Sequence, residues 1–134
     1  MKYNQLLIEF DVFDLEESIK FYVNLLGFKI EYERKEDRFV FLSFENVQIM
    51  LQEIDENCNK WETGKLEYPL GRGINFEIDV SSIDDIYNRL KQANYEIFVD
   101  IEEHGYRNNG TLMLCREFLV QDPNGYLLRF SEEV

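Results

Sequence analysis

Apolar and polar residues alternate near the start of the chain, between Gln5 and Val12. One side of this alternation carries large apolar residues: Leu6, Ile8, Phe10 and Val12. The other side is mostly polar. A period of two is typical of a strand with one buried face, so the pattern predicts a half-buried β-strand.

A helix is predicted directly after this strand. Asp14 stands where an N-cap is expected, and Glu17 follows three positions later, as in a capping box. Apolar residues then recur at helical spacing and predict a buried stripe, which comprises Ile19, Phe21, Tyr22, Leu25 and Leu26. Gly27 is suited to the left-handed residue that commonly ends a helix.

Three more strands are predicted after the helix. They lie at about 28–33, 38–44 and 47–54, and a tight turn at Glu45-Asn46 joins the last two. Residues 55–71 then lose all periodicity and carry polar residues around Trp61, which marks a connection.

The same order of elements begins again after the connection. An apolar strand side is predicted from Ile74, Phe76, Ile78 and Val80. Ser81 or Ser82 is expected to cap a helix that runs to about Ala93, and Asn94 takes the position that Gly27 holds in the first half. This repetition predicts two β-α-β-β-β modules. We expect one domain over 1–134, with module one at about 1–54, the connection at 55–71 and module two at about 72–134.

The second module ends in a predicted hairpin. Its strands lie at about 114–121 and 126–131, and the sequence Asp122-Pro123-Asn124-Gly125 between them suits a type I turn at every position. Before it, residues 104–111 read as an extra polar loop without a counterpart in module one. Extra loops on repeated scaffolds are favoured places for function.

The strand sides opposite the apolar ones carry the candidate site. Period-two geometry places on them Leu7, Glu9, Gln48, Met50, Gln52, Asn75, Glu77, Leu127, Arg129 and Ser131. This mixture has two interpretations: an ordinary solvated sheet face, or an amphipathic pocket with a few orienting polar groups. A partly buried Arg129 needs a carboxylate partner, for which Glu9 or Glu77 is the natural candidate.

Composition narrows the classes of partner and compartment. The 134 residues carry a formal net charge of -13, which argues against nucleic acid or anionic lipid as partner and favours a cationic ligand. No stretch approaches the roughly 20 apolar residues that span a bilayer, and no secretory signal is visible, so we expect a cytoplasmic protein. Cys58 and Cys115 belong to no CxxC pattern and are expected to be ordinary thiols.

Two stretches resemble a known superfamily. The run from Asp14 to Phe28 looks like the first helix of the vicinal oxygen chelate superfamily, which includes glyoxalases, extradiol dioxygenases and bleomycin-resistance proteins; the run from Arg116 to Phe130 looks like its C-terminal hairpin. The hairpin is especially similar to that of bleomycin-resistance proteins. The resemblance implies an α+β fold of two β-α-β-β-β modules, with mixed sheets curved round a cleft. It also implies a homodimer with ligand clefts at the subunit interface.

Metal-dependent relatives take one ligand from each of four strands. The matching positions in this chain are Leu7, Met50, Asn75 and Arg129. A hydrophobe, a thioether, an amide and a cation do not suit a divalent catalytic metal, so we expect no metal and no cofactor. No Ser-His-Asp or Cys-His arrangement is recognisable, and His104 is expected to be exposed or locally bonded, so catalysis is not supported.

The leading hypothesis is a metal-free protein that binds a small molecule, such as a cationic or aromatic antibiotic or metabolite. The alternatives are a metal-dependent lyase or dioxygenase with atypical ligands and a structural or regulatory dimer without a pocket. Trp61, Tyr106 and Phe39 are expected to frame the cleft, or else to pack in the core or a dimer contact. The candidate ligand-binding residues are Leu7, Glu9, Phe39, Gln48, Met50, Gln52, Trp61, Asn75, Glu77, Tyr106, Arg107, Arg116 and Arg129.

Overall fold

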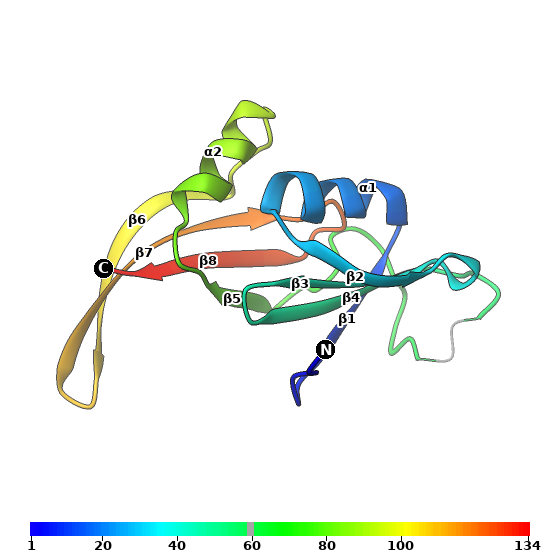
Figure 1. The fold of residues 1–134 in the computed structure, drawn as a ribbon, viewed down its shortest axis with the longest axis horizontal. Helices are drawn as coiled ribbons and strands as arrows, with labels where there is room; N and C mark the ends of the chain where they lie inside the picture. Colours follow the sequence, from blue (N-terminus) through cyan, green and yellow to red (C-terminus); the bar gives the residue numbers. More distant parts are fainter. Residues whose placement is uncertain (59–60) are drawn as a thin grey trace. The chain divides into compact units, whose positions relative to one another are not determined.

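The computed structural model describes residues 1–58 and 61–134. The chain divides into two compact units, residues Met1–Leu70 and Gly71–Val134. Each unit contains the predicted order of one strand, a helical segment and three further strands (Figure 1). The α+β fold with two β-α-β-β-β modules is therefore confirmed.

Unit 1 contains a four-stranded mixed sheet with the strand order β1-β4-β3-β2. Its strands are β1 (Ile8–Val12), β2 (Lys29–Arg34), β3 (Phe39–Phe44) and β4 (Val47–Glu53). Only β1 and β4 are parallel, because the helical segment crosses over between β1 and the rest of the sheet. The short 3-10 turn η2 (Lys35–Asp37) joins β2 to β3.

The helical segment of unit 1 begins and ends where the sequence predicts. Helix α1 (Leu15–Ile19) continues directly as the π-helix η1 (Lys20–Leu26). The Asp14 side chain accepts a hydrogen bond from the Glu17 backbone N–H at 3.2 Å. Gly27 ends the segment in the left-handed region, with φ 95°. Both end signals are confirmed.

The core of unit 1 is aromatic. Tyr22 is fully buried, and its ring lies 6.5 Å from that of Phe10 and 5.6 Å from that of Phe28. These contacts hold the helical segment against the Phe10 side of β1, and they leave Glu9 and Asp11 on the other side of the strand.

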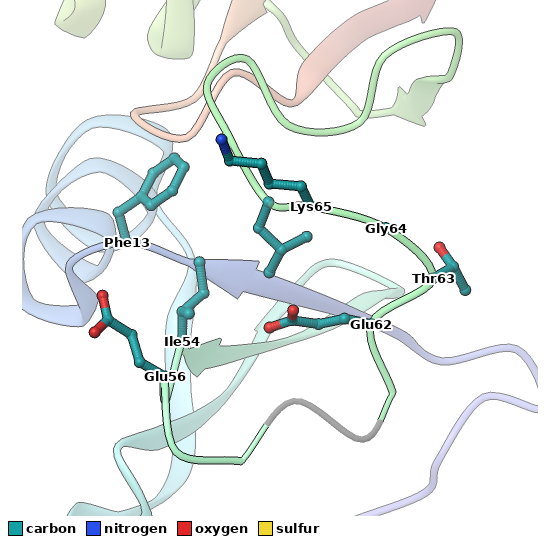
Figure 2. Close-up of a pocket in the computed structure, with 8 residues that line it drawn as sticks. Phe13, Ile54, Glu56, Glu62, Thr63, Gly64 and Lys65 are labelled. Carbon is teal, nitrogen blue, oxygen red and sulfur yellow. The ribbon is translucent and has the colours of Figure 1, made fainter.

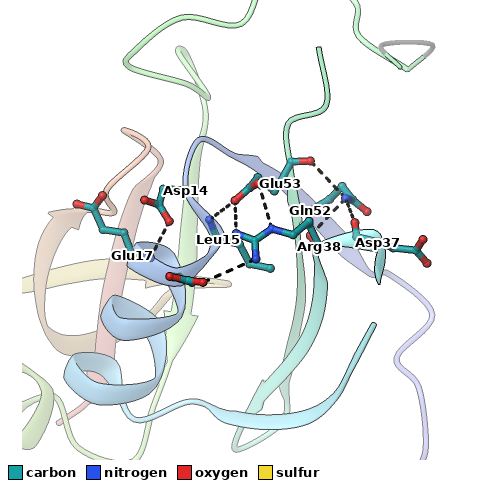
Figure 3. A network of polar contacts seen from close by, with 8 residues as sticks. Asp14, Leu15, Glu17, Asp37, Arg38, Gln52 and Glu53 are labelled. Carbon is teal, nitrogen blue, oxygen red and sulfur yellow. Dashed lines mark hydrogen bonds and ion pairs between the residues drawn. The ribbon is translucent and has the colours of Figure 1, made fainter. Parts of the chain in front are cut away.

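A polar network joins the end of β4 to the start of α1 (Figure 3). Arg38 holds the Glu53 carboxylate through two hydrogen bonds, from Nε at 3.1 Å and from Nη2 at 2.7 Å. The same carboxylate accepts the backbone N–H of Leu15 at 2.9 Å. The Arg38 bonds first, and the Leu15 bond second, lower the pKa of Glu53 below its ordinary value.

Unit 2 contains the second four-stranded sheet, with the order β5-β8-β7-β6. Its elements are β5 (Asn75–Asp79), α2 (Asp84–Gln92), β6 (Val99–Asn108), β7 (Thr111–Gln121) and β8 (Leu127–Glu133). Phe118 stacks on Phe130 at 5.5 Å and meets Tyr87 of α2 at 5.4 Å. This places the side of β7 and β8 that carries Phe118 against the helix.

The turn between β7 and β8 has the predicted hydrogen bond, from Gly125 N–H to the Asp122 carbonyl at 3.0 Å. The Asp122 side chain is buried inside the turn. Its Oδ1 accepts the backbone N–H groups of Asn124 and Tyr126, both at 2.9 Å. The predicted β-turn is therefore confirmed, and Asn124 is not among the residues with positive φ, which agrees with type I rather than type II.

Four predicted core positions differ from the structure. Leu6 is 76% exposed and Ile74 is 50% exposed, while Ile8 and Phe76 are only half-buried. The strands begin later than the apolar alternation does, at Ile8 and Asn75, so Leu6 and Ile74 precede the part that packs on the helices. Phe10 and Ile78 are buried as predicted.

The prediction of an extra loop at 104–111 is wrong. These residues belong to a long hairpin in which β6 and β7 pair up to Asn108 and Thr111. The turn residues Asn109 and Gly110 both have positive φ, 52° and 82°. Asn-Gly is the preferred dipeptide of such two-residue turns, so the sequence does contain a hairpin signal here. The polar residues on either side made the segment resemble a loop.

The predicted serine cap of the second helix is also displaced. Helix α2 has Ile83 at its N-cap position, without a side-chain hydrogen bond from that residue. Ser82 lies one residue earlier, and its hydroxyl accepts the Asp84 N–H at 3.4 Å. Asn94 takes the left-handed conformation, φ 56°, as expected from its match with Gly27.

No helix in the described part of the chain is long and apolar enough to cross a membrane.

Candidate functional site

We use the term open face of unit 2 for the side of its sheet that is opposite the Phe118 side. Alternation along the four strands places on it Asn75, Glu77, Asp79, Glu102, His104, Tyr106, Cys115, Glu117, Leu119, Arg129, Ser131 and Glu133. It therefore contains several of the predicted site residues, together with others that the sequence analysis did not single out.

Arg129 lies at the centre of a polar network on this face. Its Nε donates to Asn75 Oδ1 at 3.2 Å. Its Nη1 lies 3.4 Å from Glu77 Oε1 and 3.6 Å from Glu117 Oε2. The predicted pairing of Arg129 with a carboxylate is confirmed for Glu77. Glu117, whose side chain is only 11% exposed, is a second partner that the sequence analysis missed.

His104 extends the network across the sheet to β6. Its Nε2 lies 2.9 Å from Glu102 Oε2 and 3.5 Å from Glu117 Oε1. Glu117 thus links the imidazole of His104 to the guanidinium of Arg129. The expectation of a locally bonded histidine is confirmed, although His104 lies in a strand rather than a loop.

Negative charge exceeds positive charge on the open face of unit 2. Its cationic or potentially cationic side chains are Arg129 and His104, whereas its carboxylates are Glu77, Asp79, Glu102, Glu117 and Glu133. Even with both cations paired, carboxylates remain in excess. Such a face attracts a positively charged ligand and repels an anionic one.

An exposed aromatic ring lies within this field of carboxylates. Tyr106 of β6 is 53% exposed. Its pKa is raised, first because partial burial disfavours the phenolate, and then because Cys115, Glu77 and other acidic groups of the face add to its electrostatic cost. A ring beside carboxylates is the arrangement that recognises organic cations, since the ring face and the carboxylates both attract positive charge.

Unit 1 has a corresponding open face, opposite the Phe10 side of β1. Glu9 pairs in register with Met50, and Asp11 with Gln52. The pKa of Glu9 is raised, first by burial and second by the charge of Asp11, and burial also raises the pKa of Asp11. These two carboxyl groups lie two residues apart on one side of β1, and the charge of Arg34 partly offsets the rise for Glu9.

We expect Glu9→Gln to raise the free energy of unfolding slightly at pH 7, by roughly 0.5 kcal/mol or less, because the carboxyl group is only partly buried and solvent still screens it. A carboxyl group whose pKa is higher in the folded chain stabilises the fold while it is protonated. That contribution is lost as the pH rises through the raised pKa. The difference between variant and wild type should therefore vanish below about pH 4.

Urea unfolding between pH 3.5 and 8 measures this difference, and Glu36→Gln in the η2 turn is the matched control for the loss of one surface charge. A Glu9→Gln variant that is less stable than wild type at pH 7 would contradict the assigned direction of the Glu9 pKa.

Other predicted site residues of unit 1 have structural partners. Phe39 is 3% exposed, and Arg34 Cζ lies 4.0 Å from its ring centroid, so its ring is covered within the unit. The Gln48 amide donates to the Lys2 carbonyl, and the Gln52 amide donates to the Asp37 carbonyl, both at 2.7 Å. Contacts to the protein backbone thus occupy both amides.

The remaining predicted residues are found at other places within each unit. Leu7 precedes β1 and is half-buried, and Trp61 is 79% exposed in the connection of unit 1. Arg107 lies on the side of β6 opposite Tyr106. Arg116 faces α2, where its guanidinium pairs with Asp84 at 3.2 Å and Glu132 at 2.8 Å. Arg116 therefore joins helix and sheet on the side opposite Arg129.

A hollow of about 670 Å³ opens in unit 1, beside the connection (Figure 2). Its wall combines apolar side chains of Phe13, Ile54 and Leu66 with charged groups of Glu56, Glu62 and Lys65. No sequence pattern marks these residues, because they lie at strand ends and in a segment without periodicity. The lining carries charges of both signs, so it does not indicate a particular class of ligand.

The paired β-α-β-β-β units and the polar sheet faces define a class of two-module α+β proteins. The sequence model described as the Glyoxalase/Bleomycin resistance protein/Dioxygenase superfamily matches residues 7–130. The chain therefore belongs to this superfamily.

Several solved structures are similar to this chain. A member from Vibrio splendidus is 34% identical over 94% of this chain and 95% of that chain, with a TM-score of 0.44. A member from Alicyclobacillus acidocaldarius is 24% identical over 97% and 91%, with a TM-score of 0.64. A virulence protein from Salmonella typhimurium is 20% identical over the full length of both chains, with a TM-score of 0.67, and shares the fold. The comparison with curated proteins gives no match.

The residues at the four positions that the resemblance assigns to metal ligands do not suit a divalent metal ion. Of the residues at the four family positions, Leu7 offers no donor, Met50 only a thioether, and Arg129 a positive charge. The remaining oxygen donor, Asn75 Oδ1, accepts the hydrogen bond from Arg129. Within residues 1–58 and 61–134, no group of three His, Cys, Asp or Glu side chains is arranged to hold a metal ion.

Proposed function

We propose that this protein binds a small organic cation, without a metal ion, on the open face of unit 2. The observation that carries the proposal is the network around Arg129, in which the guanidinium at one family ligand position donates to Asn75 at another and also meets Glu77 and Glu117. The positive charge of Arg129 at this place disfavours a bound metal ion. We therefore propose binding rather than a reaction in which a metal ion activates the substrate.

The surplus of carboxylates supports the charge of the ligand. Glu77 is the best placed of them, because its side chain is 44% exposed while its Oε1 also contacts Arg129. An incoming cation can pair with Glu77 without crossing an apolar layer. The exposed ring of Tyr106 offers a flat surface for the organic part of the ligand, and each such aromatic contact contributes on the order of 1 kcal/mol.

Calorimetry with three probes tests the proposal: metal-free bleomycin, copper-loaded bleomycin and benzyltrimethylammonium. We expect wild-type protein to release or absorb heat with at least one probe at micromolar to millimolar concentration. Binding should weaken as salt rises, because the attraction is between partly exposed charges. Glu77→Gln should weaken it about threefold to fivefold, which corresponds to the loss of one partly screened charge contact.

Three further variants sharpen this test. Glu36→Gln removes one surface charge from unit 1 and should leave affinity unchanged. Tyr106→Leu should weaken binding of the aromatic probes, and Trp61→Ala shows whether the connection contributes a ring. Unchanged affinity in Glu77→Gln would remove the open face of unit 2 from the site. Near-stoichiometric nickel, zinc, manganese or iron in protein purified without chelator would overturn the metal-free function.

A further inference from the structure

The hairpin of β6 and β7 extends beyond the rest of its sheet (Figure 1). The register of β8 with β7 begins at Cys115, which lies opposite Glu133, and the Val134 N–H adds one backbone bond to the Leu114 carbonyl at 3.0 Å. Residues 105–114 therefore form a two-stranded arm. Two strands alone are marginally stable in water, and this arm exposes large apolar side chains: Tyr106 at 53%, Leu112 at 60% and Leu114 at 47%.

Strand β6 is also an edge of the sheet order β5-β8-β7-β6. One row of its backbone N–H and C=O groups has no neighbouring strand in the described part of the chain. Natural proteins protect such an edge or use it for pairing with another strand. The side chains of β6 determine which strand can pair with this edge.

We propose that β6 pairs antiparallel with β6 of a second copy of this chain, in the register that places Gly105 opposite Gly105. In this register Glu103 of each copy lies opposite Arg107 of the other, and His104 lies opposite Tyr106. Glu103, Gly105 and Arg107 share one side of β6, because they pair with Arg116, Leu114 and Leu112 of β7. The opposite charges therefore meet on the same side of the joined sheet.

Charge complementarity selects this register. A shift that centres the pairing on Glu103 sets two carboxylates opposite each other, and one that centres it on Arg107 sets two guanidinium groups opposite each other, which is unfavourable. Centring on His104 or Tyr106 leaves both charges without an opposite partner. Arg107 makes no ion pair within residues 1–58 and 61–134, on a chain whose net charge is -13.

Packing above Gly105 favours the same register, with Gly105 opposite Gly105 of the second copy. A Cβ at position 105 would lie 3.2 Å from both Leu112 Cδ1 and Leu114 Cδ2, so the two leucines cover the space above this glycine. When Gly105 of the second copy lies beside it, Leu112 and Leu114 of both copies lie next to each other and form one apolar strip. The pairing converts two two-stranded arms into a four-stranded sheet with an apolar side.

This pairing is independent of the proposed function, but it also changes the face that we propose for binding. On the open face of unit 2 it brings Tyr106 of the second copy beside His104, which lies 2.9 Å from Glu102. The aromatic ring that we assign to ligand binding would then be shared between copies.

Sedimentation velocity of the full chain tests the pairing. Wild type should be dimeric at micromolar concentration. Glu103→Arg and Arg107→Glu should each raise the dimer dissociation constant about tenfold or more, because each replaces two attractive cross-strand pairs with two repulsive ones. The double variant Glu103→Arg/Arg107→Glu restores opposite charges and should restore the dimer. Glu36→Arg carries the same charge change at another exposed site and should have no effect.

A cysteine cross-link tests the register independently. In a Cys58→Ser background, Gly105→Cys should form a disulfide-linked dimer under mild oxidation, since directly opposite residues of antiparallel strands have Cα atoms about 4.5–5.5 Å apart. Asp100→Cys should not cross-link. A monomeric wild type, a dimer insensitive to both single reversals, or a double variant that stays monomeric would each overturn the proposal. Circular dichroism of every variant separates loss of pairing from loss of fold.

Discussion

Asp122→Ala is expected to lower the free energy of unfolding by about 2–4 kcal/mol, because it leaves several buried donors without partners. Asp122 is 1% exposed, and its carboxylate accepts the backbone N–H groups of Asn124 and Tyr126 and the side-chain amide of Asn124. Alanine removes all these acceptors at once. The turn joins β7 to β8, the strand that carries Arg129, so its loss should also loosen the open face of unit 2.

Urea unfolding monitored by far-ultraviolet circular dichroism measures this change. Asn124→Ala is the graded control, because it removes the bond between the Asn124 amide and Asp122 Oδ2 at 3.0 Å but keeps the Asp122 carboxylate that accepts both backbone N–H groups. We expect it to cost about 1 kcal/mol, the usual net value of one hydrogen bond. A loss below 1 kcal/mol for Asp122→Ala would show that water or a rearranged turn satisfies the same donors.

Glu53→Gln is expected to lower the free energy of unfolding by about 1–2 kcal/mol at pH 7, as is typical for charge-assisted hydrogen bonds that are partly exposed. The substitution removes the charge that Arg38 holds through two bonds and that also accepts the Leu15 N–H (Figure 3). Those bonds tie the start of α1 to the end of β4. The variant should unfold at a lower temperature but keep its ligand affinity.

The pH dependence of this second effect has a definite sign. The pKa of Glu53 is lowered in the folded chain, first by the side-chain bonds from Arg38. Its stabilisation is therefore complete above the ordinary glutamate pKa, near 4.3, and is lost as the pH falls through the lowered value. Unfolding curves from pH 7 down to pH 2.5 should converge for wild type and Glu53→Gln at the acid end. A constant difference over this range would contradict the lowered pKa.

The two arginine networks use the same chemistry for different ends. Arg38 holds Glu53 with two close hydrogen bonds at a junction between helix and strand. Arg129 makes one hydrogen bond, to Asn75, and meets Glu77 and Glu117 at 3.4 and 3.6 Å, on the sheet face that we propose for ligand binding. We therefore expect Arg38 to contribute mainly to stability, and we propose that the longer contacts of Arg129 leave it available to a ligand.

Local sequence determined the features that depend on neighbouring backbone alone. Asp14 and Gly27 bound the helical segment, and Asp122 to Gly125 form the turn, because each residue type there satisfies a backbone conformation or an orphan N–H within a few positions. The sequence alone also determined the chemical character of the side chains at the four family positions. Side-chain identity is enough to show that Arg129 and Asn75 suit a polar network better than a metal ion.

Only the tertiary structure decided which of these side chains share a surface. Glu117 and Arg116 are adjacent in sequence, yet strand alternation and the packing of α2 send Glu117 to Arg129 and Arg116 to Asp84. Phe39 is buried because Arg34, on the neighbouring strand, covers it. The arm at 105–114 depends on β6 and β7 pairing farther than β8 reaches. Such outcomes follow from strand register and long-range packing, whose free energy is distributed over many residues and leaves no short pattern in the chain.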